Sequence, residues 1–415
     1  MKFYFPDSQD LVSPTYDFVH DEYSSLRVRQ RDDLYAHEVL NAPPYDGILV
    51  SKAIVDGSVN GVGKYSMRQR ERIYRLGVRR YFRLPDGVES LGDCGAFNYV
   101  NEELPPYSVS EVIDFYQECG FDSGVSVDHV ILGYRRPTEP GTRPKEWAER
   151  QSISLRYAEE FFANVHARGN PFEPLGAAQG WDPASYARSV QELQNMGYTR
   201  IALGGMVPLK TPDILDCLRE IDDVRQSTTA LHLLGITRVD AMERFAHHGV
   251  TSFDSTSAFR QSFMDERDNY HTAESTYAAI RVPQVDGNLL LKRAILAGKV
   301  SQRDALLAER ECLARLRGYD SGKTSLGAVV DALTNYELVS GSKNSYADQY
   351  LRTLSDAPWK RCPCFLCKKH GIEIAVFRGT ERNKRRGFHN LSVLAERMRR
   401  LSGTGMPRLQ RSNRG

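Results

Sequence analysis

The stretch DPASYARSVQELQNMGYTRIALGGMVPLKTPDILDCLREI, residues 182–221, carries the pattern that decides the fold. Asp182 and the proline after it cap a first helix, and Gly197 ends that helix. The apolar run 201–203 then predicts a buried strand, and the Thr-Pro pair at Thr211 repeats the cap at the start of a second helix. This order of helix, buried strand and helix is typical of a parallel sheet.

The same alternation extends in both directions, from about Gly47 to Asp254. Strands are expected at 47–51, near 90, at 125–128, 201–205, 231–234 and 250–253, and helices at about 66–76, 108–119, 147–167, 182–197 and 211–221. An alternation of this length predicts an α/β fold with a parallel sheet. The sheet would be either doubly wound or closed as a (β/α)8 TIM barrel.

Polar residues that follow the expected strands favour the barrel. Asp93, Asp128, Gln179, Gly204-Gly205 and Asp254 each come just after a strand. In a barrel these positions converge on the carboxyl ends of the strands, where active sites are built. No G-x-G-x-x-G motif opens a helix, which argues against a dinucleotide site. Carboxylates without a cluster of histidines indicate acid–base or covalent carboxylate chemistry, as in retaining glycosyl transfer.

The charge of the chain is divided unevenly along its length. The 415 residues include 55 Lys and Arg and 53 Asp and Glu, a net charge of +2. Residues 361–415 hold 14 Lys and Arg against 3 Asp and Glu, a net of +11, which leaves −9 for residues 1–360. A basic C-terminal extension is typical of nucleic-acid binding. The cluster 382–386 therefore becomes a candidate for phosphate contacts.

Three of the seven cysteines form a cluster that predicts a metal site. Cys362, Cys364 and Cys367 are too close together for ordinary disulfides and well placed to bind one ion tetrahedrally. The fourth ligand could be His370 or His389. Thiolates with an imidazole match the preference of Zn²⁺, and four protein ligands make a structural site.

Other features of the sequence bear on where the protein works. The four remaining cysteines are scattered singly, as suits a reducing compartment. The first residues contain no apolar core of a signal peptide, and no run of about 18 apolar residues predicts a membrane helix. We therefore expect a cytoplasmic location and no membrane partner.

At this point the motifs resemble a known family, the tRNA-guanine transglycosylases. Residues 93–98, Asp-Cys-Gly-Ala-Phe-Asn, are similar to its Asp-Ser-Gly-Gly-aromatic-Gln signature. Gln179-Gly180, Leu203–Met206, Leu233–Gly235 and Phe253-Asp254 follow in the order of that family, and the cysteine cluster with His389-Asn390-Leu391 matches its zinc motif. The resemblance runs from about residue 47 to residue 391 and implies that His389 is the fourth zinc ligand.

Within that superfamily the sequence is most similar to the branch that places 7-deazaguanine bases, such as preQ0, in DNA. Phe5-Pro6-Asp7, residues 43–51 and residues 377–390 carry this likeness. Cys94 and Ala96 replace the usual Ser and Gly, so contacts to the base at these two positions would differ from those of the family.

The resemblance implies roles for individual residues. Asp254 would attack C1′ of a guanine nucleotide to form a covalent glycosyl-enzyme, and Asp93 would act as the general acid and base. The purine would contact residues of three kinds: polar groups along its edge, backbone at two glycines, and apolar walls on its faces. These are Asp128, Gln179, Gly204, Gly205, Met206, Phe97 and Leu234. Candidate phosphate contacts are Arg260, Arg382, Lys384, Arg385 and Arg386.

The resemblance also suggests a division into domains and a set of partners. We expect the main part of the barrel in residues 1–260, a helical insertion in 261–359, a zinc subdomain that also closes the barrel in 360–400, and a basic tail in 401–415. Partners would be DNA, a 7-deazapurine base and a companion ATPase, and a homo-oligomer is left open. Two alternatives remain: the same exchange on tRNA, and a non-catalytic nucleic-acid-binding subunit.

Overall fold

The structure, a computed structural model, describes residues 1–7, 9–57, 63–136, 144–340 and 346–401. These residues form two compact units. Unit 1 holds the described residues of Met1–Ser8, Tyr45–Thr256 and Met398–Gly415, and unit 2 holds Gln9–Pro44 and Ser257–Arg397. Among the described helices, none is long and apolar enough to cross a membrane.

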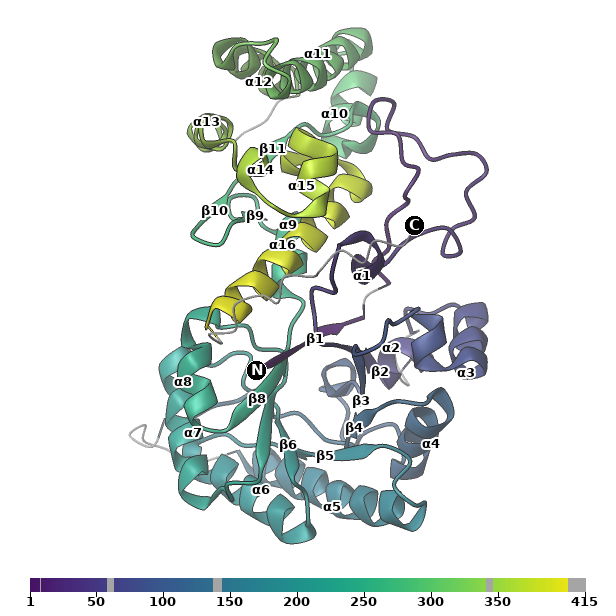
Figure 1. Ribbon diagram of the computed structural model, residues 1–415, viewed down its shortest axis with the longest axis vertical. Coiled ribbons are helices and arrows are strands. Elements are labelled where there is room, and N and C mark those ends of the chain that lie inside the picture. Colours follow the sequence, from purple (N-terminus) through teal and green to yellow (C-terminus); the bar gives the residue numbers. More distant parts are fainter. Residues whose placement is uncertain (8, 58–62, 137–143, 341–345, 402–415) are drawn as a thin grey trace, which may run out of the picture. The chain divides into compact units, whose positions relative to one another are not determined.

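Unit 1 is a closed barrel of eight parallel strands, as predicted (Figure 1). Each strand pairs with the next along the chain, and β1 pairs with β8 to close the barrel. The strands are β1 (Lys2–Pro6), β2 (Gly47–Ser51), β3 (Glu89–Asp93), β4 (Ser123–Val125), β5 (Glu173–Ala178), β6 (Arg200–Leu203), β7 (Ala230–Leu233) and β8 (Val250–Asp254). Strand β1 was not expected from the sequence.

Helices follow the strands of the barrel, and the helices expected at about 66–76, 108–119, 147–167, 182–197 and 211–221 are all present. They are α2 (Lys52–Asp56), α3 (Met67–Tyr81), α4 (Val109–Cys119), α5 (Lys145–Ala167), α6 (Pro183–Met196), α7 (Thr211–Val224) and α8 (Met242–His247), with the short turns η1 (Ala96–Tyr99) and η2 (Val239–Ala241). The Asp182 carboxylate accepts from the Ser185 amide and caps α6 as predicted, and Gly197 ends that helix at φ 106°. The cap predicted at Thr211 is wrong, because Lys210 is the N-cap and Thr211 is already helical.

The inside of the barrel is filled by side chains, so it is a packed core rather than a channel. Tyr4, Leu49, Leu91, Val125, Leu175, Ala177 and Ala202 form this core, contributed by strands β1 to β6. Leu234, just after β7, packs against it. Because the interior is solid, any ligand must bind at one end of the barrel.

Unit 2 contains the predicted helical insertion and the cysteine cluster. Its elements are α1 (Ala36–Val39), α9 (Ser257–Met264), β9 (Tyr270–His271), β10 (Thr276–Tyr277), β11 (Ile280–Arg281), η3 (Val285–Gly287), α10 (Leu289–Leu296), α11 (Gln302–Asp320), α12 (Leu326–Ser340), α13 (Ala347–Asp356), α14 (Pro358–Arg361), α15 (Phe365–His370), η4 (Gly371–Ala375), β12 (Val376–Phe377) and most of α16 (Gly379–Leu401).

Two of the expected domain boundaries differ from the structure. Residues 9–44 belong to unit 2 rather than to the barrel. Residues 360–400 do not close the barrel, since their strand β12 pairs with β11 while β1 and β8 close the barrel by themselves. The predicted tail 401–415 lies outside the described residues except for Leu401.

Candidate active site and metal centre

Three carboxylates lie beyond the carboxyl ends of the barrel strands. Asp93 is the last residue of β3, Asp254 is the last of β8, and Asp128 follows β4. Burial raises the pKa of Asp93 to about 7, and the negative charges of Asp128 and Asp254 add to the rise. The Ser51 hydroxyl and the Gly95 amide oppose it. A carboxyl group with this pKa can both give and take a proton near neutral pH.

The Asp254 carboxylate is held by one of its two oxygens. Its Oδ1 accepts from the Gly235 amide at 2.9 Å and lies 3.2 Å from His232 Nε2. Because a carboxylate only accepts, Nε2 carries the proton, and Nδ1 then accepts from the Ser252 hydroxyl at 2.9 Å. The other oxygen, Oδ2, accepts no hydrogen bond from any residue that the structure describes. Asp254 therefore presents one oriented, unengaged oxygen.

The Asp128 carboxylate is buried within a network of polar side chains. Its Oδ1 accepts from the Cys94 thiol at 3.1 Å, and its Oδ2 accepts from Gln179 Nε2 at 2.5 Å. The Tyr99 hydroxyl donates to Cys94 Sγ at 2.9 Å. Burial raises the pKa of Asp128, while Cys94 and Gln179 oppose the rise. Each carboxylate oxygen keeps a lone pair that can accept from a ligand.

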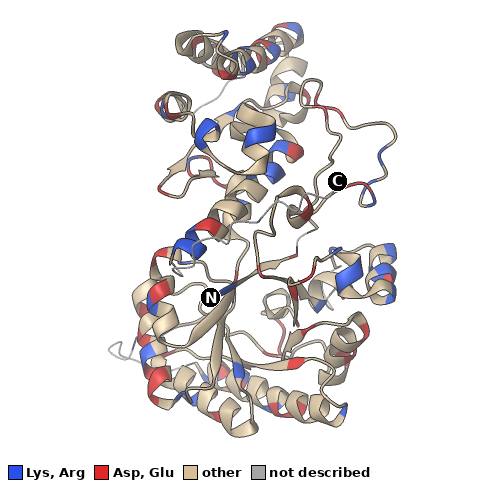
Figure 2. Cartoon of the chain, viewed as in Figure 1, with Lys and Arg blue, Asp and Glu red and all other residues tan. Residues whose placement is uncertain are grey.

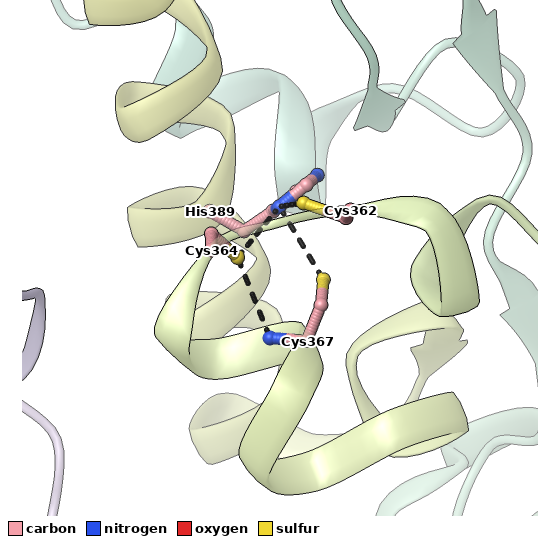
Figure 3. Close-up of side chains that lie close together, drawn as sticks. All are labelled: Cys362, Cys364, Cys367 and His389. Atoms are coloured by element: carbon pink, nitrogen blue, oxygen red, sulfur yellow. Dashed lines mark hydrogen bonds between the residues drawn. The ribbon is translucent and has the colours of Figure 1, made fainter. Parts of the chain in front are cut away.

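Unit 2 brings together the four residues that are predicted to bind a metal. Cys362, Cys364, Cys367 and His389 offer ligand atoms that all lie within 4.8 Å of one another (Figure 3). His389 Nδ1 is 3.6, 3.4 and 3.5 Å from the three sulfurs in turn. A tetrahedral zinc ion with its usual bond lengths would separate sulfur and nitrogen by about 3.5 Å. The spacing thus fits zinc.

Further contacts orient the histidine of this centre. The other ring nitrogen of His389, Nε2, donates to the His271 carbonyl at 2.8 Å, which leaves Nδ1 free to bind a metal. Tyr270 stacks on the His389 ring, and its hydroxyl lies 3.1 Å from Cys367 Sγ. His370, the other candidate ligand, packs instead against Phe18. With four protein ligands the ion would stabilise the fold and leave no position for a substrate.

The expectation that the 382–386 cluster contacts phosphates is not supported by the structure. Arg382 is buried and pairs with Asp21 and, at 2.7 Å, with Glu373. The other members are engaged in the same way within unit 2: Arg385 pairs with Glu381, Arg386 donates to the carbonyls of Ser262 and Val376, and Lys384 lies 3.4 Å from Asp10. Arg382, Lys384 and Arg385 are thus paired with acidic side chains, and Arg386 is bonded to backbone carbonyls. Arg260, in contrast, is exposed on α9 and remains a candidate.

A comparison with known proteins shows the family. The chain is 47% identical over 404 residues to a protein of Salmonella montevideo called DNA-guanine transglycosylase, and the match covers 96% of each chain. No family model matches. The chain belongs to the DNA-directed branch of the tRNA-guanine transglycosylase superfamily.

The structure of this transglycosylase brings most of the expected site residues to one end of the barrel. Phe97, on η1, is 51% exposed and Leu234 is partly buried, so both remain available as walls of a base pocket. Gln179 is buried, and its side-chain oxygen Oε1 accepts from the Ile131 amide while Nε2 donates to Asp128, so it orients that carboxylate. Met206 is fully buried, so its side chain is not exposed to a ligand in this structure.

The glycines of the transglycosylase site are required by the protein itself. A Cβ at Gly204 would lie 2.1 Å from Gln179 Nε2. Gly205 has φ +75°, and a Cβ there would lie 2.3 Å from the Ile131 carbonyl oxygen. Both glycines therefore keep Gln179 and the loop in place, besides any room they leave for a base.

Sequence reasoning missed three residues that complete the site. His232 lies between the buried residues Leu231 and Leu233, and Ser252 is buried next to Phe253, so both resemble core positions. Tyr99 lies on η1 and also donates to the Asp128 carbonyl at 3.1 Å. Cys94 was noted only as a departure from the family signature, although its thiol occupies the hydrogen-bonding place expected of a hydroxyl. One feature of the sequence could have indicated His232: it lies on the strand next to the one that ends at Asp254.

Proposed function

We propose that the protein exchanges guanine in DNA for a 7-deazaguanine base such as preQ0 through a covalent intermediate on Asp254. The observation that carries the proposal is the state of Asp254, whose Oδ1 is fixed by His232 and Gly235 while Oδ2 is unengaged. A nucleophile held in this way meets C1′ in one orientation. The name of the similar Salmonella protein supports guanine in DNA as the target.

The proposed reaction has two steps: the first forms the bond between Asp254 and C1′, and the second breaks it. Asp254 Oδ2 forms a bond to C1′ as the bond from C1′ to N9 of guanine breaks, and Asp93 gives its proton to the leaving base. The incoming deazaguanine then loses its N9 proton to Asp93 and attacks C1′, which releases Asp254. One glycosidic bond replaces another, so no ATP is consumed in the exchange. The pKa of Asp93, about 7, suits a group that must alternate in this way.

Recognition of the base is assigned to the Asp128 network. The remaining lone pairs of the Asp128 carboxylate can accept from the N1–H and amino group of a purine. Guanine and 7-deazaguanine share this edge, so one pocket can bind both. Phe97 and Leu234 would cover the two faces of the ring. In duplex DNA the base must first leave the stack, at a cost of a few kcal/mol.

The test follows a labelled base into a nucleic acid. The protein is incubated with radiolabelled guanine or preQ0 and either duplex DNA or tRNA, and label in the polymer is counted. We expect incorporation into DNA. Label in tRNA alone would reject the DNA assignment, and label in neither would favour a non-catalytic subunit.

A second experiment tests the nucleophile. Asp254→Ala should abolish exchange and the covalent complex seen on denaturing gels, with melting unchanged. Full activity in this variant would refute the assignment of Asp254. A companion ATPase, a homo-oligomer and a cytoplasmic location stay predictions of the sequence.

A further inference from the structure

Helix α3 carries the most concentrated positive charge of the barrel unit. Residues 64–83 include eight Lys and Arg and one acidic residue, Glu71, a net charge of +7. Residues 1–360 carry a net charge of −9, so residues 1–63 and 84–360 together carry −16. Figure 2 shows blue segments recurring along α3. A local reversal of sign on an acidic body marks a place where anions gather.

The fold turns these cations toward solvent. Ser66 caps α3 through a capping box with Gln69, and Gln69 and Ile73 face the interior. The opposite side holds Arg68 and Arg75, seven residues apart and therefore on one face. The helix is kinked at Gly77, where φ is 73°, and Arg80 lies in the short helical turn beyond the kink. Met67 is the one large apolar side chain that residues 64–83 expose, so this surface lacks the apolar centre of a protein–protein interface.

Three of the arginines are not neutralised within the protein. Arg70 pairs with Asp56 at 2.9 Å, and Arg79 lies 3.6 Å from Asp122. Arg68, Arg75 and Arg80 are exposed. None of their side chains forms a hydrogen bond or ion pair with any residue in the described part of the chain. Their guanidinium groups can therefore bind an external anion without breaking internal bonds.

The start of α3 lies at the active-site end of the barrel. The helix comes after β2 and the short helix α2, and helices of a barrel begin at the carboxyl ends of the strands, where Asp93 and Asp254 also lie. Tyr65, just before the helix, donates to Asp7 at 2.7 Å, immediately after β1. From Arg68 to Arg75 the helix rises about 10 Å. This length matches about three phosphates, at roughly 3.4 Å per nucleotide along a duplex.

We propose that Arg68, Arg75 and Arg80 on α3 bind the sugar–phosphate backbone of the DNA whose guanine enters the barrel. The inference rests on the proposed function for its choice of DNA. It replaces the buried 382–386 cluster as the phosphate-binding surface, and it assigns positive charge to the barrel unit rather than to the C-terminal extension.

The test measures binding separately from base exchange. Binding of a 20-base-pair duplex is followed by fluorescence anisotropy at several salt concentrations for the wild type and for Arg68→Gln/Arg75→Gln/Arg80→Gln. We expect affinity to fall about tenfold or more, and the slope of log K against log salt to decrease by about 2 to 3, since each lost phosphate contact removes about 0.9. In base exchange, KM for DNA should rise while kcat at saturating DNA is kept.

The matched control neutralises three exposed arginines on α11, as Arg303→Gln/Arg310→Gln/Arg315→Gln. That helix carries equal numbers of acidic and basic residues, and we expect its variant to bind DNA like the wild type. Melting temperatures of both variants should match the wild type.

Several results would overturn the inference. Unchanged DNA affinity in the α3 variant would do so, and would point to an acidic protein as the partner of this surface. An equal loss in the α11 variant, or a loss confined to tRNA, would also overturn it. A wild type that binds DNA but exchanges no base would reject the proposed function, while the binding comparison would still decide the role of α3.

Discussion

Asp93→Asn should stabilise the barrel at alkaline pH while it removes base exchange. Burial, together with the negative charges of Asp128 and Asp254, raises the pKa of Asp93 from 3.8 to about 7. The native state therefore binds this proton more tightly than the unfolded chain does. Stability from this group is greatest below about pH 3.8 and declines as the pH rises to about 7, above which the full cost of the buried charge remains.

The size of the effect follows from the two pKa values. Each pH unit between 3.8 and about 7 costs about 1.4 kcal/mol, so ionised Asp93 lowers the free energy of unfolding by about 4 kcal/mol at pH 8. At pH 5.5 the cost is about half as large. Asparagine has no charge to bury, so the difference in stability between variant and wild type should grow by about 2 kcal/mol between these two pH values.

Urea unfolding at pH 5.5 and pH 8 measures this difference. Both proteins carry Trp359→Phe, so that fluorescence reports only Trp147 and Trp181 of the barrel unit. Any loss of hydrogen bonds on changing Asp to Asn is the same at both pH values and cancels. Asp240→Asn, at an exposed site of the same unit, is the control and should show no such growth. A stability difference that is equal at the two pH values would refute the raised pKa of Asp93.

Three further predictions test other parts of the structure. Chelation of zinc, or Cys364→Ser, should lower the melting temperature of unit 2, and unchanged melting of a metal-free protein would contradict a structural zinc site. Arg386→Met should destabilise the fold by about 3 kcal/mol, since buried carbonyls lose their donors, yet leave DNA affinity at low temperature unchanged. His232→Phe removes one donor to Asp254, the proposed nucleophile, and should reduce kcat about 10- to 100-fold with KM for DNA unchanged; wild-type kcat would rule out a role in holding Asp254.

The barrel could be predicted from the sequence because its signals are local. Gly120 and Gly197 end helices within one turn, and the Asp182 cap involves a residue three positions away. The cysteine cluster is local as well, apart from His389. Strand β1 was missed because its five residues have no preceding helix or turn to frame them. Residues 9–44 contain few regular elements, so only their contacts, such as Asp21 with Arg378, assign them to unit 2.

Of the candidate site, the sequence alone could predict the carboxylates but not the residues that orient them. Asp93 and Asp254 end strands, and the register of the barrel then brings them to the same end. The hydrogen bonds that orient them depend on pairs from different strands, such as His232 with Asp254. A histidine inside an apolar strand looks the same in sequence whether it fills the core or holds a nucleophile. Only the position of its partner distinguishes the two.

The arginines show why a count of charges does not locate a binding surface. A phosphate binds an arginine only if the free energy of the new contact exceeds the free energy lost when the arginine leaves its existing partners. Arg382 would have to leave Asp21 and Glu373 and expose their buried carboxylates, which costs several kcal/mol. Arg68 loses only water. A basic cluster that folds against acidic side chains is thus part of the core, while exposed arginines without such partners remain available to bind a nucleic acid.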